Sequence, residues 1–194
     1  GGELIGTGQY RKEVQPDHPL GGSPAFYEFN CTAIELSVDE ETGHITIHKH
    51  IIVGDTGTSL HPKQVAGQDE GAAIQGLGHT LMEHMILDEH GAIRNLGAID
   101  YRIPTSMDLP LHMESAAIEN EDGPGPYGAK GVSEGGLLSV QSAVGSAVAD
   151  ATGVVIRDLP LTPEHVWRSL RDARVNEQPE RQEAREPGGQ HGEA

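Results

Sequence analysis

Apolar and polar residues alternate along two stretches in the first third of the chain. In residues 25–38, Ile34, Leu36 and Val38 fall on one face, and the alternation resumes over residues 45–53. The residues between end at Gly43, which tolerates the positive φ of a tight turn. Because such alternation is typical of half-buried strands, the pattern predicts a β-hairpin. We expect the small residues that follow, from Gly54 to His61, to form a loop.

The pattern changes to a helical period at Pro62, a residue suited to the first position of a helix. We predict a long helix from Pro62 to Leu87. A glycine inside a helix costs about 1 kcal/mol relative to alanine, so several glycines on one face indicate that another backbone or a ligand comes close. Both readings stay open for the face formed by Gly67, Gly71, Ile74, Gly78, Leu81 and Met85.

The second half of the chain predicts four further elements. Residues 112–119 read as a strand, and residues 134–152 as a helix of small and apolar residues. We expect that helix to be buried on nearly all sides. Gly153 ends it, residues 154–156 read as a short strand, and a last amphipathic helix begins at Thr162-Pro163.

These elements predict one domain between two less regular ends. Residues 1–24 carry Gly, Pro and charge without a period, and we expect them to be an entry segment lying on a partner surface. Residues 25–172 form the domain, and residues 173–194 are polar enough to form a disordered tail. Strands and helices mix without regular βαβ spacing. The fold class is therefore predicted to be α+β, with a mixed sheet packed with two long helices in two layers.

Charge and cysteine content narrow the function classes. The 194 residues include 30 acidic and 13 basic residues, for a net charge of −17. The absence of a basic patch argues against a nucleic-acid partner. No apolar run approaches 18 residues and no signal peptide stands out, so we expect a cytoplasmic protein without a membrane partner. Cys31 is the only cysteine, which excludes an internal disulfide or an iron–sulfur site built from this chain alone.

The strongest candidate for chemistry is a glycine-rich loop, Gly-Ala-Lys-Gly-Val-Ser-Glu-Gly-Gly, which spans residues 128–136 and enters the predicted second helix. Ser133 is suited to cap that helix. At such a position we expect the helix end to favour the ionised carboxylate of Glu134 and burial to disfavour it, a balance that a general base needs. The alternative is that Glu134 only complements the helix dipole, which is worth about 0.3–1 kcal/mol.

A second candidate loop runs from Asp55 to His61, with Gln64 and Gln68 beyond it. Its hydroxyls and glycine open a helix, as in a cradle for phosphate or a polar heterocycle, although such loops are often plain turns. Residues 123–128 spell G-x-G-x-x-G, but their prolines remove N–H donors and no helix follows directly. The eleven histidines suggest a zinc hydrolase as a further hypothesis, although no H-E-x-x-H occurs.

Five motifs occur in the order and spacing of one known family. From about Ala25 to Leu170 the chain resembles the C-terminal part of the molybdopterin-binding subunit of molybdenum hydroxylases, the xanthine dehydrogenase and aldehyde oxidase family. The motifs are Asp55-Thr-Gly with His61-Pro, Gly67-Gln-Asp-Glu-Gly-Ala-Ala-Ile-Gln-Gly-Leu-Gly78, Leu81-Met-Glu83, Asp100-Tyr-Arg-Ile-Pro104 and Gly128-Ala-Lys-Gly-Val-Ser-Glu134.

The resemblance implies a cofactor and a reaction. The cofactor would be molybdopterin carrying molybdenum, in some members as the cytosine dinucleotide. Glu134 would act as general base on the molybdenum-bound hydroxyl while an aldehyde or N-heterocycle is hydroxylated with oxygen derived from water. Gly131, Val132 and Ser133 would lie beside the metal, with no metal ligand from this chain. The residues that would contact the dinucleotide tail are Asp55, Ser59, Leu60, His61, Gln64 and Gln68.

The resemblance also implies partners. The family's molybdenum subunit is several times longer, so we expect this chain to be inactive without the remaining portion of that subunit. Partner chains or domains would carry [2Fe–2S] clusters and FAD. Ser133 stands where many members have glycine, and His61 where asparagine is common. The alternative is a non-catalytic scaffold or assembly module of the same complex.

Overall fold

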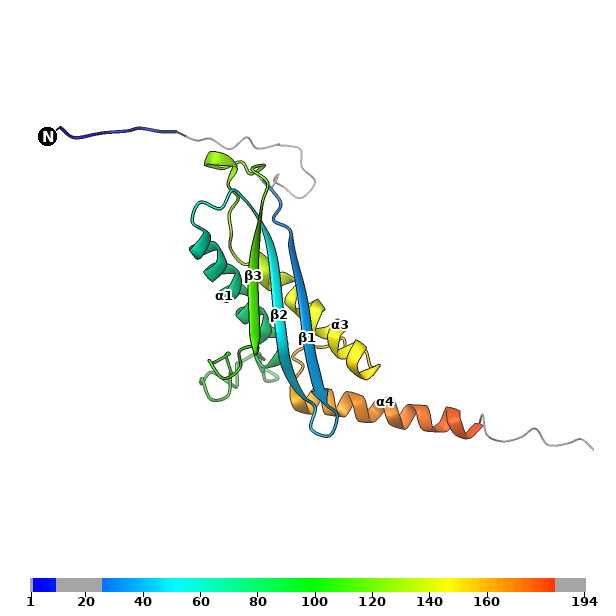
Figure 1. Cartoon of the computed structure of the whole chain (residues 1–194). Helices are drawn as coiled ribbons and strands as arrows, with labels where there is room; N and C mark the ends of the chain where they lie inside the picture. The colour runs from blue at the N-terminus through cyan, green and yellow to red at the C-terminus, as the bar shows by residue number, and fades with distance from the viewer. Residues whose placement is uncertain (1, 10–25, 184–194) are drawn as a thin grey trace, which may run out of the picture.

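The computed structural model describes residues 2–9 and 26–183, which include a three-stranded sheet and helices in two layers. Figure 1 shows helices α1 and α3 lying along one face of the sheet, with α4 near the hairpin turn. The predicted α+β class is confirmed. The elements are β1 (Asn30–Asp39), β2 (His44–Gly57), α1 (Pro62–Leu81), β3 (His112–Glu119), a 3₁₀ turn (Pro126–Gly128), α2 (Gly135–Leu138), α3 (Val140–Thr152) and α4 (Pro163–Glu183).

The sheet is mixed, in the order β1-β2-β3. The predicted hairpin is confirmed, since β1 pairs antiparallel with β2, and β3 then pairs parallel to β2. The second pairing extends β2 to Gly57, so the expectation of a loop from Gly54 is wrong. Asp55 pairs with Ile118 in that register. The partner strand lies about sixty residues further along the chain, which is why local sequence did not reveal this extension.

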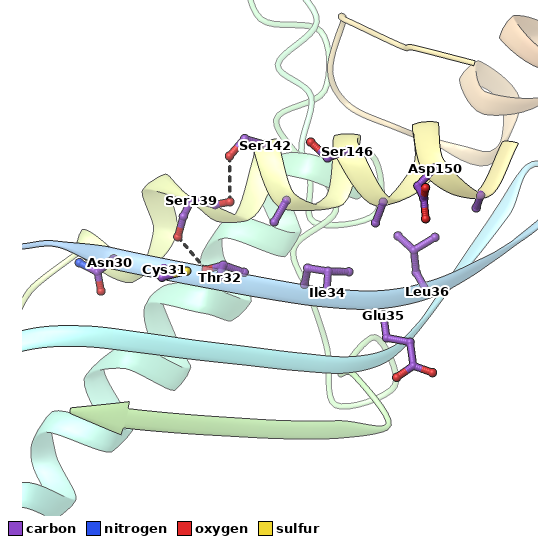
Figure 2. Close-up of a pocket in the computed structure, with 13 residues that line it drawn as sticks. Asn30, Cys31, Thr32, Ile34, Glu35, Leu36, Ser139, Ser142, Ser146 and Asp150 are labelled. Carbon is purple, nitrogen blue, oxygen red and sulfur yellow. Dashed lines mark hydrogen bonds between the residues drawn. The ribbon is translucent and has the colours of Figure 1, made fainter. Parts of the chain in front are cut away.

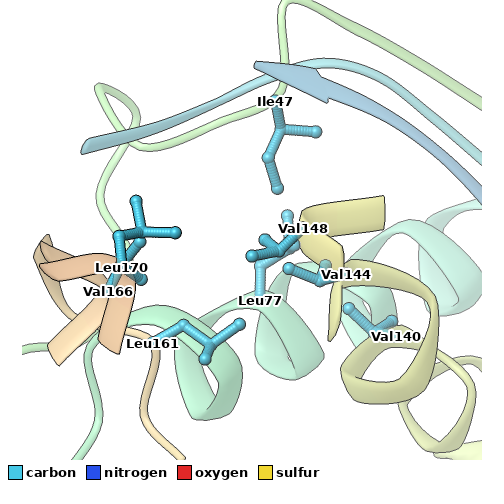
Figure 3. Close-up of a cluster of buried hydrophobic side chains, with 8 residues drawn as sticks. All are labelled: Ile47, Leu77, Val140, Val144, Val148, Leu161, Val166 and Leu170. Carbon is cyan, nitrogen blue, oxygen red and sulfur yellow. The ribbon is translucent and has the colours of Figure 1, made fainter. Parts of the chain in front are cut away.

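The hydrophobic core lies between the sheet and the helices (Figure 3). Buried valines recur every fourth residue along α3, which brings them onto one side of the helix. They meet Leu77 of α1 and Ile47 of β2, and α4 closes the end of the core. The core residues are Ile47, Leu77, Val140, Val144, Val148, Leu161, Val166 and Leu170.

Helix α1 ends at Leu81, six residues earlier than predicted. The backbone N–H groups of Met82 and Glu83 both donate to the Gly78 carbonyl, at 3.0 and 2.8 Å. Glu83 then accepts a hydrogen bond from the Tyr101 hydroxyl at 2.9 Å. The two bonds to Gly78 close the helix, and the Tyr101 contact holds Glu83 outside it, although the helical period of the sequence continues.

Other parts of the chain approach only some of the α1 glycines closely. Nothing lies within 4 Å of a Cβ built at Gly67 or Gly71, whereas a Cβ at Gly76 would lie 2.8 Å from Val140 Cβ. A Cβ at Gly78 would lie 2.8 Å from Pro104 Cδ. Of the glycines on the predicted face only Gly78 is therefore packed tightly, and helix–helix packing accounts for Gly76.

The predicted second helix is broken at Ser139, which separates α2 from α3. The Ser139 hydroxyl shares a 2.7 Å hydrogen bond with Thr32 of β1. The expectation of burial on nearly all sides is wrong, because only the valine stripe of α3 is buried. The opposite side, with Ser142 and Ser146, borders a groove against β1 (Figure 2).

The two ends of the chain differ from the prediction in one respect. Helix α4 continues to Glu183, so residues 173–183 are helical, in continuity with the part of the helix that packs at Leu170. Residues 184–194 lie outside the described part. Residues 2–9 have no regular structure, and the partner contact predicted for residues 1–24 stays a prediction.

Residues 154–156 do not form the predicted strand.

No helix in the described part of the chain is both long and apolar enough to cross a membrane.

Two glycine substitutions in α1 test this packing. Gly76→Ala should lower the free energy of unfolding of the full chain by about 1–3 kcal/mol, because its Cβ would overpack against Val140. The matched change Gly71→Ala, on an open face of the same helix, should raise it by up to about 1 kcal/mol. Urea denaturation measures both. Equal effects of the two changes would contradict the packing described here.

Candidate functional site

A cavity of about 580 Å³ lies where the end of β2, the first turns of α1 and the loop 129–132 meet. It brings together five residues that the sequence predicts as cofactor contacts: Leu60, His61, Gln64, Gln68 and Val132. The same cavity is lined by five residues that sequence reasoning missed, namely Thr58, Val65, Gly67, Ala129 and Lys130. The two candidate loops of the sequence therefore form one site.

An ion pair joins those two loops. Lys130 Nζ lies 2.6 Å from Asp55 Oδ2 and 2.8 Å from Asp122 Oδ1, and the Lys130 side chain is only 4% exposed. The Gly57 N–H donates to Asp55 Oδ1 at 3.1 Å. The Lys130 backbone N–H also donates to the Thr56 carbonyl at 3.0 Å. Asp55 does not line the cavity itself but binds Lys130, which does. Its contact with a cofactor stays a prediction.

The pKa values of this pair follow from the contacts. Burial raises the pKa of Asp55, but the hydrogen bonds from Lys130 and Gly57 outweigh it and hold the pKa below the usual 3.8. The pKa of Lys130 is raised above 10.5 by its hydrogen bonds to Asp122 and Asp55. Both groups are therefore charged at neutral pH. No sequence signal marks the pair, because its two residues lie 75 positions apart in the chain.

The N-terminus of α1 opens into the cavity. His61 is the N-cap, and its Nδ1 accepts a hydrogen bond from the Gln64 N–H at 3.3 Å. No acidic residue occupies the first turn. Because a helix N-terminus carries partial positive charge, this end of the cavity favours an anion such as a phosphate.

Glu134 lies beside the cavity rather than in its wall. Gln75 Nε2 donates to Glu134 Oε1 at 3.0 Å, and Gln68 Nε2 donates to the Ser133 carbonyl at 2.7 Å. Both glutamines belong to α1, so this one helix binds both Ser133 and Glu134. Glu134 is exposed, so the expectation that its side chain is buried at the start of a long helix is wrong. The break at Ser139 leaves only four residues in α2.

Ser133 does not cap a helix as predicted. Glu134 is the N-cap of α2, and no side chain makes a capping hydrogen bond there. Ser59 donates its backbone N–H to Glu119 Oε1 at 3.1 Å, while its buried hydroxyl has no partner among the described residues. Gly131 lies against Phe26, whose Cζ would be 3.2 Å from a Cβ at that position. The contacts of these three residues with a cofactor or metal stay predictions.

The histidine zinc hypothesis gains no support from the geometry. Across residues 2–9 and 26–183, no three His, Cys, Asp or Glu side chains gather in a way that could hold a metal ion. His50 is fully buried on β2, and burial lowers its pKa below 6.5. A buried neutral imidazole of this kind is part of the sheet's packing.

Comparison with known proteins gives consistent matches. The profile of the molybdopterin cofactor-binding domain matches residues 1–110. The chain is 36% identical over 171 residues to the xanthine dehydrogenase molybdenum-binding subunit of Escherichia coli O157:H7, covering 88% of this chain but 21% of that protein. The chain thus spans about one fifth of the length of that relative.

Solved structures agree. Quinoline 2-oxidoreductase from Pseudomonas putida 86 matches 70% of this chain and 17% of its own with a TM-score of 0.63 and 35% identity. The aldehyde oxidoreductase from Desulfovibrio gigas matches 77% of this chain and 16% of its own, with a TM-score of 0.69 and 29% identity.

Removal of the Lys130 charge should lower the stability of the protein at neutral pH more than in acid. The depressed pKa of Asp55 contributes stability that is present above the unfolded value of 3.8 and is lost as pH falls through the lower folded value. Lys130→Met should leave Asp55 buried without its cation and lower the melting temperature at neutral pH by several degrees. The difference from wild type should shrink as the pH falls below about 4, where Asp55 becomes protonated.

The double variant Asp55→Asn with Lys130→Met is the control, because it removes both charges together. It should be more stable than Lys130→Met alone, as a thermal melt followed by circular dichroism would measure. If the double variant is the less stable of the two, the ion pair does not join the loops in the way described.

Proposed function

The chain belongs to the molybdopterin cofactor-binding domain family of the molybdenum hydroxylases, and we propose that it supplies part of the cofactor pocket and the general base of such an oxidoreductase. The observation that carries the proposal is the double use of α1. Gln64 and Gln68 of this helix line the cavity, while Gln75 binds the Glu134 carboxylate. A bound cofactor and the base would thus be held by one rigid element.

The cavity fits the proposed cofactor in size and chemistry. About 580 Å³ lies within the range of roughly 300–1,000 Å³ found for small-molecule sites. The amides of Gln64 and Gln68 offer hydrogen bonds to a polar heterocycle, and the N-terminus of α1 suits a phosphate. His61 and Leu60 would complete the contacts, and in a cytosine dinucleotide form of the cofactor the phosphorylated tail would lie at this end of the cavity. When bound, the cofactor would supply a molybdenum centre that accepts electrons from the substrate.

Glu134 would perform the proton transfer. Its Oε1 accepts a hydrogen bond from Gln75, which orients the carboxylate, and the side chain is exposed so that it can face a reactant. A positioned carboxylate of this kind can accept a proton as the new carbon–oxygen bond forms. The substrate class proposed is an aldehyde or N-heterocycle, with water as the oxygen source.

The proposal requires partners. The chain spans 21% of the E. coli relative, and we expect the remaining portion of the molybdenum subunit to close the cavity and to orient the substrate. Iron–sulfur and flavin subunits would remove the electrons, because Cys31 alone cannot hold a cluster. The relative is named as a molybdenum-binding subunit, which supports an assembly of this kind.

Glu134→Gln in the assembled complex tests the base directly. Turnover should fall by about 10²–10⁴-fold, because the amide cannot accept the proton, while molybdenum content stays unchanged. Glu70→Gln, a neutralised exposed acid on α1, is the matched control and should retain turnover. Turnover that survives Glu134→Gln at full molybdenum content would leave only the scaffold role.

Removal of polar side chains from the cavity tests cofactor binding. The double change His61→Ala and Gln64→Ala should lower the pterin and molybdenum content of the purified complex several-fold, since both residues line the cavity at the N-terminus of α1. Ser142→Ala, on the exposed side of α3, should leave both contents unchanged. Metal analysis and pterin fluorescence measure the outcome, and full occupancy in the double variant would remove this cavity as the cofactor site.

A further inference from the structure

A buried polar cluster lies beneath the turn that carries Glu134. Asp69 of α1 is 1% exposed, and neither of its carboxylate oxygens has a hydrogen-bond partner among the described residues. Glu28 Oε1 and Asn30 Oδ1 are likewise buried and unpaired in that part of the chain. An unpaired buried polar group is costly, so each of these four oxygens requires an explanation.

Glycines bring the cluster against the elements of the site. A Cβ at Gly54 would lie 2.9 Å from Asn30 Oδ1 and 3.4 Å from Asp69 Oδ2, so both side chains press on the same point of β2. A Cβ at Gly135 would collide with the Asn30 amide and the Glu28 carboxyl group. Gly135 directly follows Glu134 in the sequence, and the cluster is therefore the surface on which the Glu134 turn rests.

The unpaired atoms share one chemical property. All four are oxygens that accept hydrogen bonds, and two of the three side chains are acids. What completes the cluster must therefore donate a hydrogen or carry positive charge. The close contacts at Gly54 and Gly135 show that these side chains lie tightly against both backbones. A proton on one carboxyl group needs no additional room, and its O–H can donate to a neighbouring oxygen.

The charges around Asp69 favour its protonated form. Burial, followed by the negative charges of the neighbouring Glu28 and Glu70, raises its pKa to about 6. β2 presents only the uncharged Gly54 at this point, and Asp55 beyond it is bound by Lys130. The α2 turn presents Gly135 and Gly136, next to the Glu134 carboxylate. No cation contributes to the shift, so ionisation of Asp69 would place a second negative charge beside Glu28.

We propose that Glu28, Asn30 and Asp69 form a proton-holding positioning cluster, in which one shared proton keeps the Glu134 turn packed against α1 and its loss loosens that packing. Asp69 acts through Glu28 and Asn30, which lie against Gly135, and is a positioning residue. The link to catalysis rests on the function proposed for Glu134, whereas the shared proton and its effect on the turn do not.

Carboxyl NMR of the full chain tests the shared proton without any cofactor. With ¹³C-labelled Asp and Glu, one carboxyl carbon should titrate near pH 6, and this signal should be absent from Asp69→Asn. In Glu28→Gln the midpoint should shift to lower pH, because the negative neighbour is gone. Glu70→Gln, at an exposed position, should shift it less. If no carboxyl titrates above about 5, or if the titration near 6 survives Asp69→Asn, the proposal is wrong.

The effect on the turn is measured in the same samples. The amide resonances of Gly135 and Gly136 should move with the midpoint of the Asp69 titration in wild type and should keep their low-pH positions in Asp69→Asn. The raised pKa of Asp69 contributes stability that is present below the ordinary pKa of 3.8 and is lost as the pH rises to about 6. The melting temperature of wild type should therefore fall between these two pH values relative to that of Asp69→Asn. Amide signals that ignore the titration would overturn the positioning role.

Two further measurements separate the shared proton from a bound cation, and the positioning role of the cluster from the role proposed for Glu134. Saturable shifts of the same carboxyl signals on addition of Na⁺, K⁺ or Ca²⁺, lost in Asp69→Asn, would show that a cation completes the cluster and would overturn the shared proton. In the assembled complex, turnover of wild type should fall several-fold relative to Asp69→Asn as the pH rises through the NMR midpoint. A complex whose turnover is insensitive to Glu134→Gln would refute the proposed base while leaving the NMR result intact.

Discussion

The ion pair between Lys130 and Asp55 connects the two halves of the candidate site. Asp55 lies near the end of β2, in the part that pairs with β3, and Lys130 lies in a loop 75 residues further along the chain. Their contact, with the Lys130 N–H bonded to Thr56, brings the loop 129–132 over the N-terminus of α1. Both charges are removed from water, so the pair is stable only because hydrogen bonds from Gly57 and a second aspartate, Asp122, accompany it.

Helix α1 is the second constraint, because it faces three different environments along its length. Its first turns border the cavity, its middle buries Asp69 against the sheet, and Gln75 reaches Glu134. The distribution follows from the helical period, which returns the same face every three to four residues.

The unpaired buried oxygens around Asp69 lower the stability of the fold, and the hydrophobic core offsets this loss elsewhere. The core lies at the far end of α1 and along the valines of α3. Around Asp69, by contrast, glycines replace larger side chains so that strand, helix and turn can approach closely.

The sequence by itself determined the elements that depend on local pattern: the hairpin closed by Gly43, the strand 112–119, the start of α1 at Pro62 and the family motifs. These rest on periodicity and turn chemistry, which are readable within a short window. The tertiary structure alone decided where α1 ends, how far β2 extends, and that α2 and α3 separate at Ser139. It also decided the Lys130–Asp55 pair and the burial of Asp69, because partners distant in the chain supply those contacts and no local pattern encodes them.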